Sequence, residues 1–263
     1  MRTLGKARVE PNGMKAIIYA AGIGKRLEGV FGKRPKILLP FGGRSLLDWH
    51  LQRLTEVGVR QLVMVTGYER GQIEAALNVL RPRHPLAIST RVNPDFTEGS
   101  VLSFHASIPD LESATEPVLL MDGDVLYPAE MLRRLVQSKH STALLIDRDY
   151  STADDDPVLV PIKDGKPCDF RKKWSGEAEV VGESIGFFKV DPADLPLLIE
   201  ETHERSTGAG RADSYDDVTR ALVLAGRFGY EDVTGLPWME IDFPGDVGRA
   251  KDEVLPAIRK LSS

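Results

Sequence analysis

Cysteine is nearly absent from this chain of 263 residues, because Cys168 is the only one. A single cysteine forms no disulfide within the chain, and this agrees with the reducing cytoplasm that we expect as its location. Long apolar runs are absent as well, since none approaches the roughly 20 residues that a membrane span requires. Residues 1–13 are polar and lack the apolar stretch of a signal peptide, so we expect a flexible extension there.

An excess of positive charge is also absent, since acidic residues outnumber basic ones and the formal net charge is −5. A protein that follows a nucleic-acid backbone needs a basic face, so this balance argues against a nucleic-acid partner but permits a small basic pocket. The histidines are scattered, no cysteine–histidine cluster has zinc spacing, and no Gly-x-Ser-x-Gly segment is present. Neither a zinc site nor a hydrolase nucleophile is therefore indicated.

The first half of the chain alternates short apolar runs with segments of helical spacing. The pattern predicts strands at residues 16–20, 61–66, 86–92, 117–121 and 143–147, and helices at residues 45–57, 72–80, 100–108 and 129–136. Such alternation is typical of parallel strands joined by helices that cover both faces of a sheet. We therefore predict an α/β fold with a mostly parallel central sheet flanked by helices.

The second half of the chain is less regular. Its pattern predicts strands at residues 158–161, 180–189 and 238–242, and helices at residues 195–205, 215–224 and within 244–259. No low-complexity linker separates the two halves, and no internal repeat is present. We therefore expect a single domain over residues 14–263, with both halves contributing to one sheet.

A loop of small and basic residues follows the first predicted strand and reads Ala20-Ala21-Gly22-Ile23-Gly24-Lys25-Arg26-Leu27. Ligands of parallel sheets bind beyond the carboxyl ends of the strands, where small residues let backbone N–H groups approach a phosphate. Lys36 follows ten residues after Arg26 as a further candidate phosphate ligand. The loop fits neither a Walker A motif, because Arg26 follows the lysine, nor a dinucleotide fingerprint, because Leu27 replaces the third glycine. A glycine turn beside solvated charges is the alternative.

Two acidic segments are candidates for a metal site. One is Asp122-Gly123-Asp124 after a predicted strand, and the other is Trp238-Met239-Glu240-Ile241-Asp242. Mg²⁺ is a hard cation that binds one or two carboxylates together with substrate phosphate oxygens. Strand alternation places Trp238, Glu240 and Asp242 on one face, so we expect Asp242 to complete a metal site with Asp124. A polar turn and a solvated edge strand are the alternatives.

A short basic run, Arg171-Lys172-Lys173, lies in the second half of the chain. Such a run is a candidate site for the phosphate of an acceptor, because ammonium and guanidinium groups pair strongly with phosphate oxygens. We select Lys172 as the catalytic cation and keep Lys173 as its alternative. A solvated turn is the competing interpretation.

These motifs resemble the nucleotide-binding signature of nucleoside-triphosphate transferases with the glycosyltransferase-A-like Rossmann fold. That resemblance rests on residues 14–27, on Pro35-Lys36 and on the Gly-Asp pair after the fourth strand, and it extends to the C-terminal helix. Within the superfamily, the chain is similar to the bacterial phosphocholine cytidylyltransferase family, whose relatives act on 2-aminoethylphosphonate or inositol phosphate. The stretches that carry this second resemblance are 91–96, 98–103, 120–127, 181–188 and 235–243.

The resemblance implies CTP as the donor, release of pyrophosphate, and Mg²⁺ held by Asp124 and Asp242. It also implies contacts to the nucleotide from Ala20, Ala21, Gly22, Gly24, Lys25, Arg26, Lys36, Gly99, Ser100 and Asp122. Catalysis then rests on positioning and charge neutralisation by Lys25, Arg26, Lys36 and Lys172. Sugar-nucleotide enzymes typically carry Gly-Thr at residues 99–100 and Pro-Leu at 126–127, where this chain has Gly-Ser and Leu-Tyr. Both departures weaken a sugar-phosphate assignment.

The acceptor is expected to be a small phosphate- or phosphonate-bearing alcohol or amine, such as phosphocholine or 2-aminoethylphosphonate. An ammonium head would meet Trp238 or Tyr127 by cation–π contact, with Glu240 or Glu183 as counter-charge. The alternatives are an inositol-phosphate cytidylyltransferase and a sugar-1-phosphate nucleotidyltransferase. Other classes are a nucleotide sensor without catalysis and a glycosyltransferase that uses an Asp-x-Asp motif. The oligomeric state, monomer or homodimer, is left open by the sequence.

Overall fold

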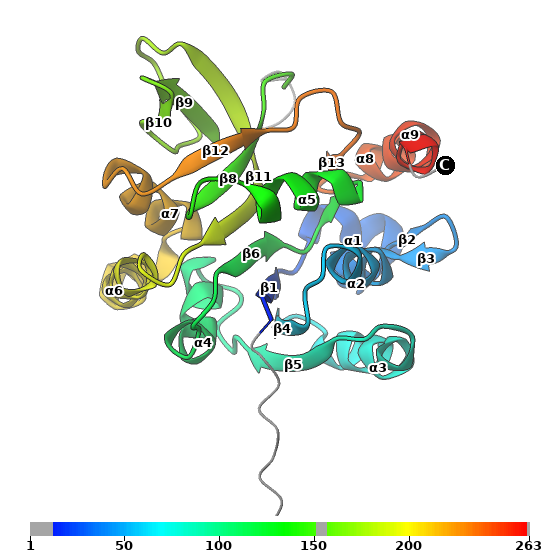
Figure 1. Cartoon of the computed structure of the whole chain (residues 1–263). Coiled ribbons are helices and arrows are strands. Elements are labelled where there is room, and N and C mark those ends of the chain that lie inside the picture. The colour runs from blue at the N-terminus through cyan, green and yellow to red at the C-terminus, as the bar shows by residue number, and fades with distance from the viewer. Residues whose placement is uncertain (1–12, 151–156, 262–263) are drawn as a thin grey trace, which may run out of the picture.

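The computed structural model describes residues 13–150 and 157–261 of the chain. Of the predicted extension at residues 1–13, only Gly13 is among them. A nine-stranded sheet crosses the molecule (Figure 1). Its strands are β1 (Lys15–Ala20), β4 (Gln61–Thr66), β5 (Ala87–Val92), β6 (Val118–Asp122), β8 (Ala143–Asp147), β9 (Leu159–Lys163), β10 (Lys166–Pro167), β11 (Val180–Val190) and β12 (Gly229–Asp232). Their order is β10–β9–β11–β6–β1–β4–β5, and β8 pairs with both β11 and β12.

Strand direction divides the sheet in two. β6, β1, β4 and β5 are parallel neighbours, whereas β11 runs antiparallel to β6, β8 and β9. The inner parallel strands β1, β4 and β6 are covered on both faces and are therefore mostly apolar, which explains the continuous apolar runs in the first half. This confirms the predicted α/β fold with a mostly parallel sheet flanked by helices. The antiparallel pairing of β11 is the part that the sequence did not indicate.

Helices cover the two faces of the sheet. One core cluster contains apolar side chains of α2 (Leu46–Glu56), α3 (Arg70–Leu80) and α5 (Ala129–Gln137). A second cluster contains those of α4 (Val101–Glu112), α6 (Leu195–Arg205) and α7 (Tyr215–Leu224). Figure 1 shows α4, α6 and α7 together on one side of the sheet, opposite α2. No helix among the described residues is both long enough and apolar enough to cross a membrane.

The predicted elements agree with the structure in type, and the short elements are the ones that the sequence analysis did not foresee. They are α1 (Lys25–Phe31), the β2–β3 hairpin (Pro40–Phe41 and Arg44–Ser45), β7 (Val125–Leu126), β10, β12, and 3₁₀ turns at Lys36–Leu38, Arg81–Arg83 and Gly208–Ala212. The strand predicted at residues 238–242 is reduced to β13 (Met239–Glu240), which pairs with β7 outside the main sheet. The closing segment consists of α8 (Pro244–Arg249), a π-helical stretch (Ala250–Val254) and α9 (Leu255–Leu261).

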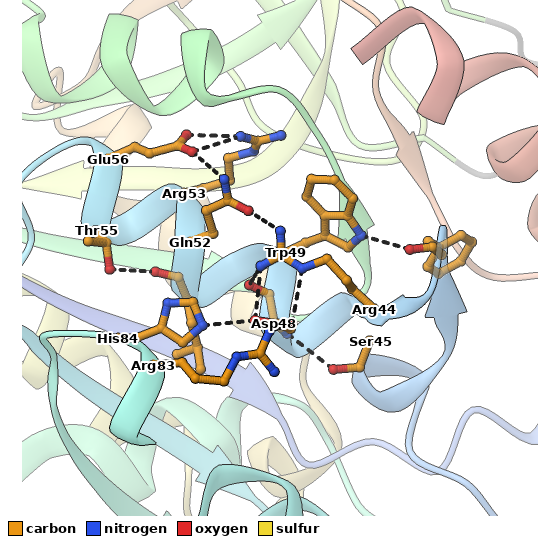
Figure 2. Close-up of polar contacts among 12 residues, drawn as sticks. Arg44, Ser45, Asp48, Trp49, Gln52, Arg53, Thr55, Glu56, Arg83 and His84 are labelled. Carbon is orange, nitrogen blue, oxygen red and sulfur yellow. Dashed lines mark hydrogen bonds and ion pairs between the residues drawn. The ribbon is translucent and has the colours of Figure 1, made fainter. Parts of the chain in front are cut away.

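A polar cluster fixes the position of α2 against the rest of the fold. The carboxylate of Asp48 is only 4% exposed and accepts hydrogen bonds from Arg44, Arg83 and His84 (Figure 2). Burial of this carboxylate raises its pKa, but the hydrogen bonds and positive charges outweigh that effect and lower it to about 2. A charge that is buried and hydrogen-bonded from several sides joins α2 to the segment that precedes β5.

Candidate active site

The loop after β1 brings its basic residues to the carboxyl end of the parallel strands. Gly24 has a positive φ of 65°, which favours glycine, and a Cβ at this position would lie 2.9 Å from Cγ of Lys36. The side chain of Lys36 therefore lies directly against the loop. Lys25 and Arg26 begin helix α1 and are exposed, so their cationic groups are accessible to a ligand.

A cavity of about 360 Å³ opens beside this loop. Its lining comes from the loop, the end of β1 and the acidic segments, and consists of Tyr19, Ala20, Gly22, Gly24, Lys25, Arg26, Lys36, Ile37, Gly123, Asp124 and Asp242. Most of the residues predicted to bind the nucleotide are thus gathered in one place. Ala21 is buried behind the cavity wall, where its carbonyl accepts a hydrogen bond from the Tyr68 N–H.

Three carboxylates converge at one side of this cavity. Asp124, Glu240 and Asp242 each offer an oxygen atom, and these atoms lie within 4.8 Å of one another. Carboxylate oxygens at this separation suit a hard divalent cation such as Mg²⁺. The sequence predicted Asp124 and Asp242 as this pair, whereas it assigned Glu240 to the acceptor.

The carboxylates are brought together by a short strand pair. Glu240 of β13 faces Val125 of β7, and the Ile241 N–H donates a 2.9 Å hydrogen bond to the carbonyl of Asp124. These backbone contacts hold two segments that are far apart in the sequence side by side. The carboxylates of Asp124 and Asp242 thereby project into the same space.

Lys36 neutralises part of this negative charge. Its ammonium lies 2.8 Å from Oδ2 of Asp124 and also forms an ion pair with Asp242, while Arg26 contacts Asp242 from the other side at 3.0 Å. Burial alone would lower the pKa of Lys36, but the two carboxylates raise it well above its ordinary value. The lysine is therefore a permanent cation at neutral pH.

The pKa of Glu240 shows how strongly the acids crowd one another. Desolvation of its carboxyl group among the neighbouring acids, together with the charges of Asp124 and Asp242, raises this pKa well above its ordinary value, although the residue as a whole is exposed. Asp122 behaves in the same way, because burial and the charge of Asp124 both raise its pKa. Added positive charge would stabilise the ionised form of each group.

The carboxylate of Asp122 is hydrogen-bonded by Tyr215, a residue that the sequence patterns did not indicate. The Tyr215 hydroxyl donates a short hydrogen bond to Asp122, and burial together with this carboxylate raises the pKa of Tyr215 well above its ordinary value. Gly186 has a positive φ of 75°, and a Cβ there would lie 2.0 Å from the Asp122 carboxylate. Only glycine fits at this point of β11.

A second cavity of about 680 Å³ adjoins the first, since Arg26 and Asp242 line both. It is rich in acids, with eight carboxylates and three cations in its lining. The carboxylates are Asp122, Asp147, Asp149, Glu183, Asp216, Glu240, Asp242 and Asp246, and the cations are Arg26, Lys172 and Arg249. Burial raises the pKa of Asp216, one of these carboxylates.

Most, but not all, of the residues predicted to bind the acceptor line this second cavity. Lys172, Glu183, Trp238 and Glu240 all line the second cavity, whereas Lys173 is not among its lining residues. The indole N–H of Trp238 donates a 2.7 Å hydrogen bond to Asp147, which fixes the ring in place. Tyr150 and Tyr215 add further aromatic rings to the lining.

Tyr127 is the clear exception among the predicted acceptor residues. Its side chain is 2% exposed and packs edge-on against Phe187, with ring centroids 4.7 Å apart. Its hydroxyl lies 3.1 Å from Nδ1 of His50, so even its polar end is used inside the core. An acceptor cannot contact a ring in that position, and the placement of Tyr127 in the acceptor site is wrong.

Gly99 and Ser100 lie outside the lining of both cavities. The Gly99 N–H donates to the carbonyl of Arg211, and the Ser100 hydroxyl accepts from the Tyr215 N–H at 3.0 Å. A Cβ on Gly99 would lie 2.2 Å from the carbonyl oxygen of Asp213. Close backbone packing therefore requires this glycine, and the contact of Gly99 and Ser100 with the nucleotide stays a prediction.

The chain is similar to curated relatives and to solved structures. A CMP-5'-(3-aminopropyl)phosphonate synthase of Streptomyces rubellomurinus is 29% identical over 253 residues, which is 90% of this chain but only 38% of that protein. The inositol-1-phosphate CTP transferase of T. maritima has a TM-score of 0.75 at 22% identity, with 96% of this chain and 97% of that chain covered. The CTP:phosphocholine cytidylyltransferase of Streptococcus pneumoniae has a TM-score of 0.72 at 19% identity, covering 91% and 98%. These two solved structures confirm the fold.

A family model covers the part of the chain that carries the nucleotide loop and the Asp122–Asp124 segment. The model describes the MobA-like NTP transferase domain and matches residues 16–179, which is more than half of the chain. The superfamily that the glycine-rich loop predicted is thereby confirmed. This chain belongs to the MobA-like NTP transferase family.

Proposed function

We propose that this chain is a Mg²⁺-dependent cytidylyltransferase that transfers CMP from CTP to a small acceptor carrying both a phosphate or phosphonate and an ammonium group. The observation that carries the proposal is the pair of adjoining cavities, one lined by cations and small residues and the other by acids and aromatic rings. Asp242 and Arg26 line both cavities, so two substrates would meet at the carboxylates.

The first cavity suits the triphosphate of a nucleotide. Lys25, Arg26 and Lys36 supply three cations beside a loop of small residues, where backbone N–H groups can approach phosphate oxygens. These cations would hold the triphosphate and stabilise the charge of the leaving pyrophosphate. The named relatives that use CTP support cytosine as the base.

Asp124 and Asp242 would hold the metal ion, with Glu240 as a third carboxylate within reach. When bound, Mg²⁺ supplies Lewis-acid stabilisation of charge on the phosphate oxygens. Lys36 contacts the same two aspartates, and a cation placed between them would release its ammonium toward the triphosphate. The donor set therefore fits the proposed metal.

The second cavity suits an acceptor that is anionic at one end and cationic at the other. Lys172, Arg26 and Arg249 are the cations that would attract its phosphate or phosphonate. Asp147 and Asp149 lie in the same lining as Trp238, and carboxylates beside an aromatic ring favour an ammonium group. The aminopropylphosphonate named in one relative has this combination of charges.

The reaction needs no general base under this proposal. A phosphate or phosphonate oxygen of the acceptor is already anionic near neutral pH and attacks the α-phosphorus of CTP. A new P–O bond forms to the acceptor while the bond between the α-phosphorus and the bridging oxygen to the β-phosphate breaks, and that electron pair leaves with pyrophosphate. The residues of the chain contribute by holding the two anions in line and by neutralising their repulsion.

The direct test measures pyrophosphate release with Mg²⁺ and each of CTP, UTP, dTTP, ATP and GTP. Each nucleotide is crossed with 2-aminoethylphosphonate, 3-aminopropylphosphonate, phosphocholine, inositol 1-phosphate and glucose 1-phosphate. Release with CTP and an amine-bearing acceptor is the expected result. Release only with glucose 1-phosphate would show a sugar nucleotidyltransferase. Release only with inositol 1-phosphate would show that the acceptor does not carry an ammonium group.

A further inference from the structure

A buried histidine lies directly behind the candidate metal site. His50 is on helix α2, is fully buried, and takes no part in either cavity. Its Nε2 lies 3.3 Å from the carbonyl oxygen of Gly123, and its Nδ1 lies 3.1 Å from the Tyr127 hydroxyl. The Gly123 carbonyl belongs to the peptide unit whose nitrogen is that of Asp124.

The hydrogen-bond partners determine which ring nitrogen carries the proton. A carbonyl oxygen only accepts, so Nε2 of His50 must be the donor to Gly123. Burial lowers the pKa of His50 to about 4, which keeps the ring neutral at neutral pH. A neutral imidazole has one acceptor nitrogen, so Nδ1 accepts from the Tyr127 hydroxyl. The Tyr127 hydroxyl therefore donates a hydrogen bond to His50, and His50 donates one to the Gly123 carbonyl.

The backbone at Gly123 is a place where a hydrogen bond from His50 would restrict motion. Gly123 has no side chain to restrict its backbone, so the peptide plane before Asp124 has more freedom than an ordinary residue would allow. Three hydrogen bonds limit that freedom: Gly123 N–H to the Tyr19 carbonyl at 3.1 Å, the bond from His50, and the bond from the Ile241 N–H to the Asp124 carbonyl. Only the bond from His50 comes from a side chain, and it comes from outside the sheet.

We propose that His50 is a positioning residue for the metal site, which holds the Gly123–Asp124 peptide plane so that the Asp124 carboxylate faces Asp242 and Glu240. Groups that orient the ligands of a metal typically change its affinity or the activity by about 10-fold to 100-fold when they are removed. The inference rests on the proposed metal site. It adds a residue from the helical layer to a centre otherwise built from loops and short strands.

The test compares two polar replacements that differ in reach. The amide nitrogen of His50→Gln can replace Nε2 as the donor to Gly123, whereas the shorter His50→Asn cannot reach that carbonyl. Mn²⁺ titrations followed by electron paramagnetic resonance, in the presence of CTP, would measure metal affinity without turnover. We expect affinity to fall about 10-fold in His50→Asn and to stay within about 3-fold of the wild-type protein in His50→Gln.

His84 offers a matched control. It is a half-buried histidine whose side chain is 8% exposed and hydrogen-bonded to Asp48, away from both cavities. His84→Gln is expected to lower the melting temperature and to leave Mn²⁺ affinity unchanged. If neither His50 variant folds, Tyr127→Phe, which removes the donor to Nδ1, is expected to weaken Mn²⁺ binding about 3-fold.

The outcomes separate this inference from the proposed function. If the wild-type protein binds no Mn²⁺ with CTP, the metal proposal fails and the role of His50 fails with it. If the wild-type protein binds Mn²⁺ and His50→Asn binds it as tightly as His50→Gln, only the role of His50 is rejected. An unchanged affinity in Tyr127→Phe would reject it in the same way should both His50 variants misfold.

Discussion

The ammonium of Lys36 lies 2.8 Å from Oδ2 of Asp124, inside the group of carboxylates that would hold a divalent cation. It also pairs with Asp242, so one lysine neutralises part of the charge of both candidate ligands. The lysine and a metal ion therefore compete for the same oxygens. A nucleotide changes that balance, because its phosphates offer Lys36 another partner.

Lys36→Met is expected to separate metal binding from catalysis. Without the ammonium, only Arg26 beside Asp242 offsets the repulsion among the carboxylates of Asp124, Glu240 and Asp242, so Mn²⁺ should bind about tenfold more tightly in the absence of nucleotide. CMP transfer should fall about 100-fold, because a cation that stabilises the leaving pyrophosphate is lost. Mn²⁺ titration by electron paramagnetic resonance and a pyrophosphate assay measure the two effects.

Lys33→Met is the control for the loss of one lysine close to the loop, since Lys33 is exposed and lies outside the lining of the cavity. It should leave both measurements unchanged. Weaker Mn²⁺ binding in Lys36→Met would show that Lys36 supports the metal site instead of competing with the ion.

Asp124→Asn is expected to lower CMP transfer by about 100-fold or more, because a metal ion contributes several kcal/mol to stabilising charge on the phosphates. The side chain is about three-quarters buried and keeps its shape in the asparagine variant, so the fold should be retained. Circular dichroism checks the fold, and the pyrophosphate assay checks the rate. Asp252→Asn, at an exposed position, is the control. Near-normal turnover in Asp124→Asn would show that Asp124 is not a ligand of the metal ion.

Lys172 and Lys173 offer a comparison between adjacent lysines, of which only Lys172 lines the second cavity. Lys172→Ala is expected to raise the KM for the acceptor about tenfold, because a charged hydrogen bond to its phosphate is worth about 1.5 kcal/mol or more. The KM for CTP should change little. Equal effects of Lys172→Ala and Lys173→Ala would mean that the basic run acts through its overall charge.

Sequence patterns predicted the long elements well, because these carry strong apolar periodicity. The bounds predicted for β4, α6 and α7 agree with the structure residue for residue. Helix α1 was missed since Leu27 is its only buried residue and no apolar stripe marks it. The β7–β13 pair was missed for another reason: two residues of strand give no local signal, and their pairing depends on the folded chain.

The same distinction holds within the site. Motifs singled out Asp124, Asp242 and Lys36, which the structure brings together, because each directly follows or lies close to a recognisable loop or strand end. Tyr127 was misplaced, since the sequence shows an aromatic residue near the acids but not that its ring points into the core. Tyr215 begins α7, and only the folded chain brings its hydroxyl to Asp122 at the end of β6.

Asp48→Asn is expected to lower the free energy of unfolding at pH 7 by about 2 kcal/mol, the equivalent of the drop of the Asp48 pKa from its ordinary 3.8 to about 2. Because the folded-state pKa is lowered, the contribution of the charge is complete above about pH 4 and is lost as the pH falls through 2. Urea unfolding of both proteins between pH 7 and pH 3 should show the difference shrinking at the acid end.

Glu130→Gln is the matched control for that comparison. Glu130 also contacts two arginines, Arg133 and Arg134, but its side chain is 41% exposed. Ion pairs on the surface contribute about 1 kcal/mol or less. A loss in Asp48→Asn no larger than that in Glu130→Gln would show that the buried cluster of Figure 2 contributes little to holding α2.

The acidic wall of the second cavity leads to a prediction about substrate choice. Asp149→Asn removes one exposed carboxylate, and its attraction for an ammonium group is worth about 1 kcal/mol, so the KM for an aminoalkylphosphonate should rise about fivefold. Trp238→Leu removes the ring that is fixed by Asp147 and should raise the same KM about tenfold.

Inositol 1-phosphate is the discriminating acceptor for both variants, because it carries a phosphate but no positive charge. If the acids and the indole recognise an ammonium group, the KM for inositol 1-phosphate should stay the same or fall when a carboxylate is removed. Parallel increases for charged and uncharged acceptors would instead mean that both variants distort the cavity. Recognition would then depend on the shape of the lining more than on its charge.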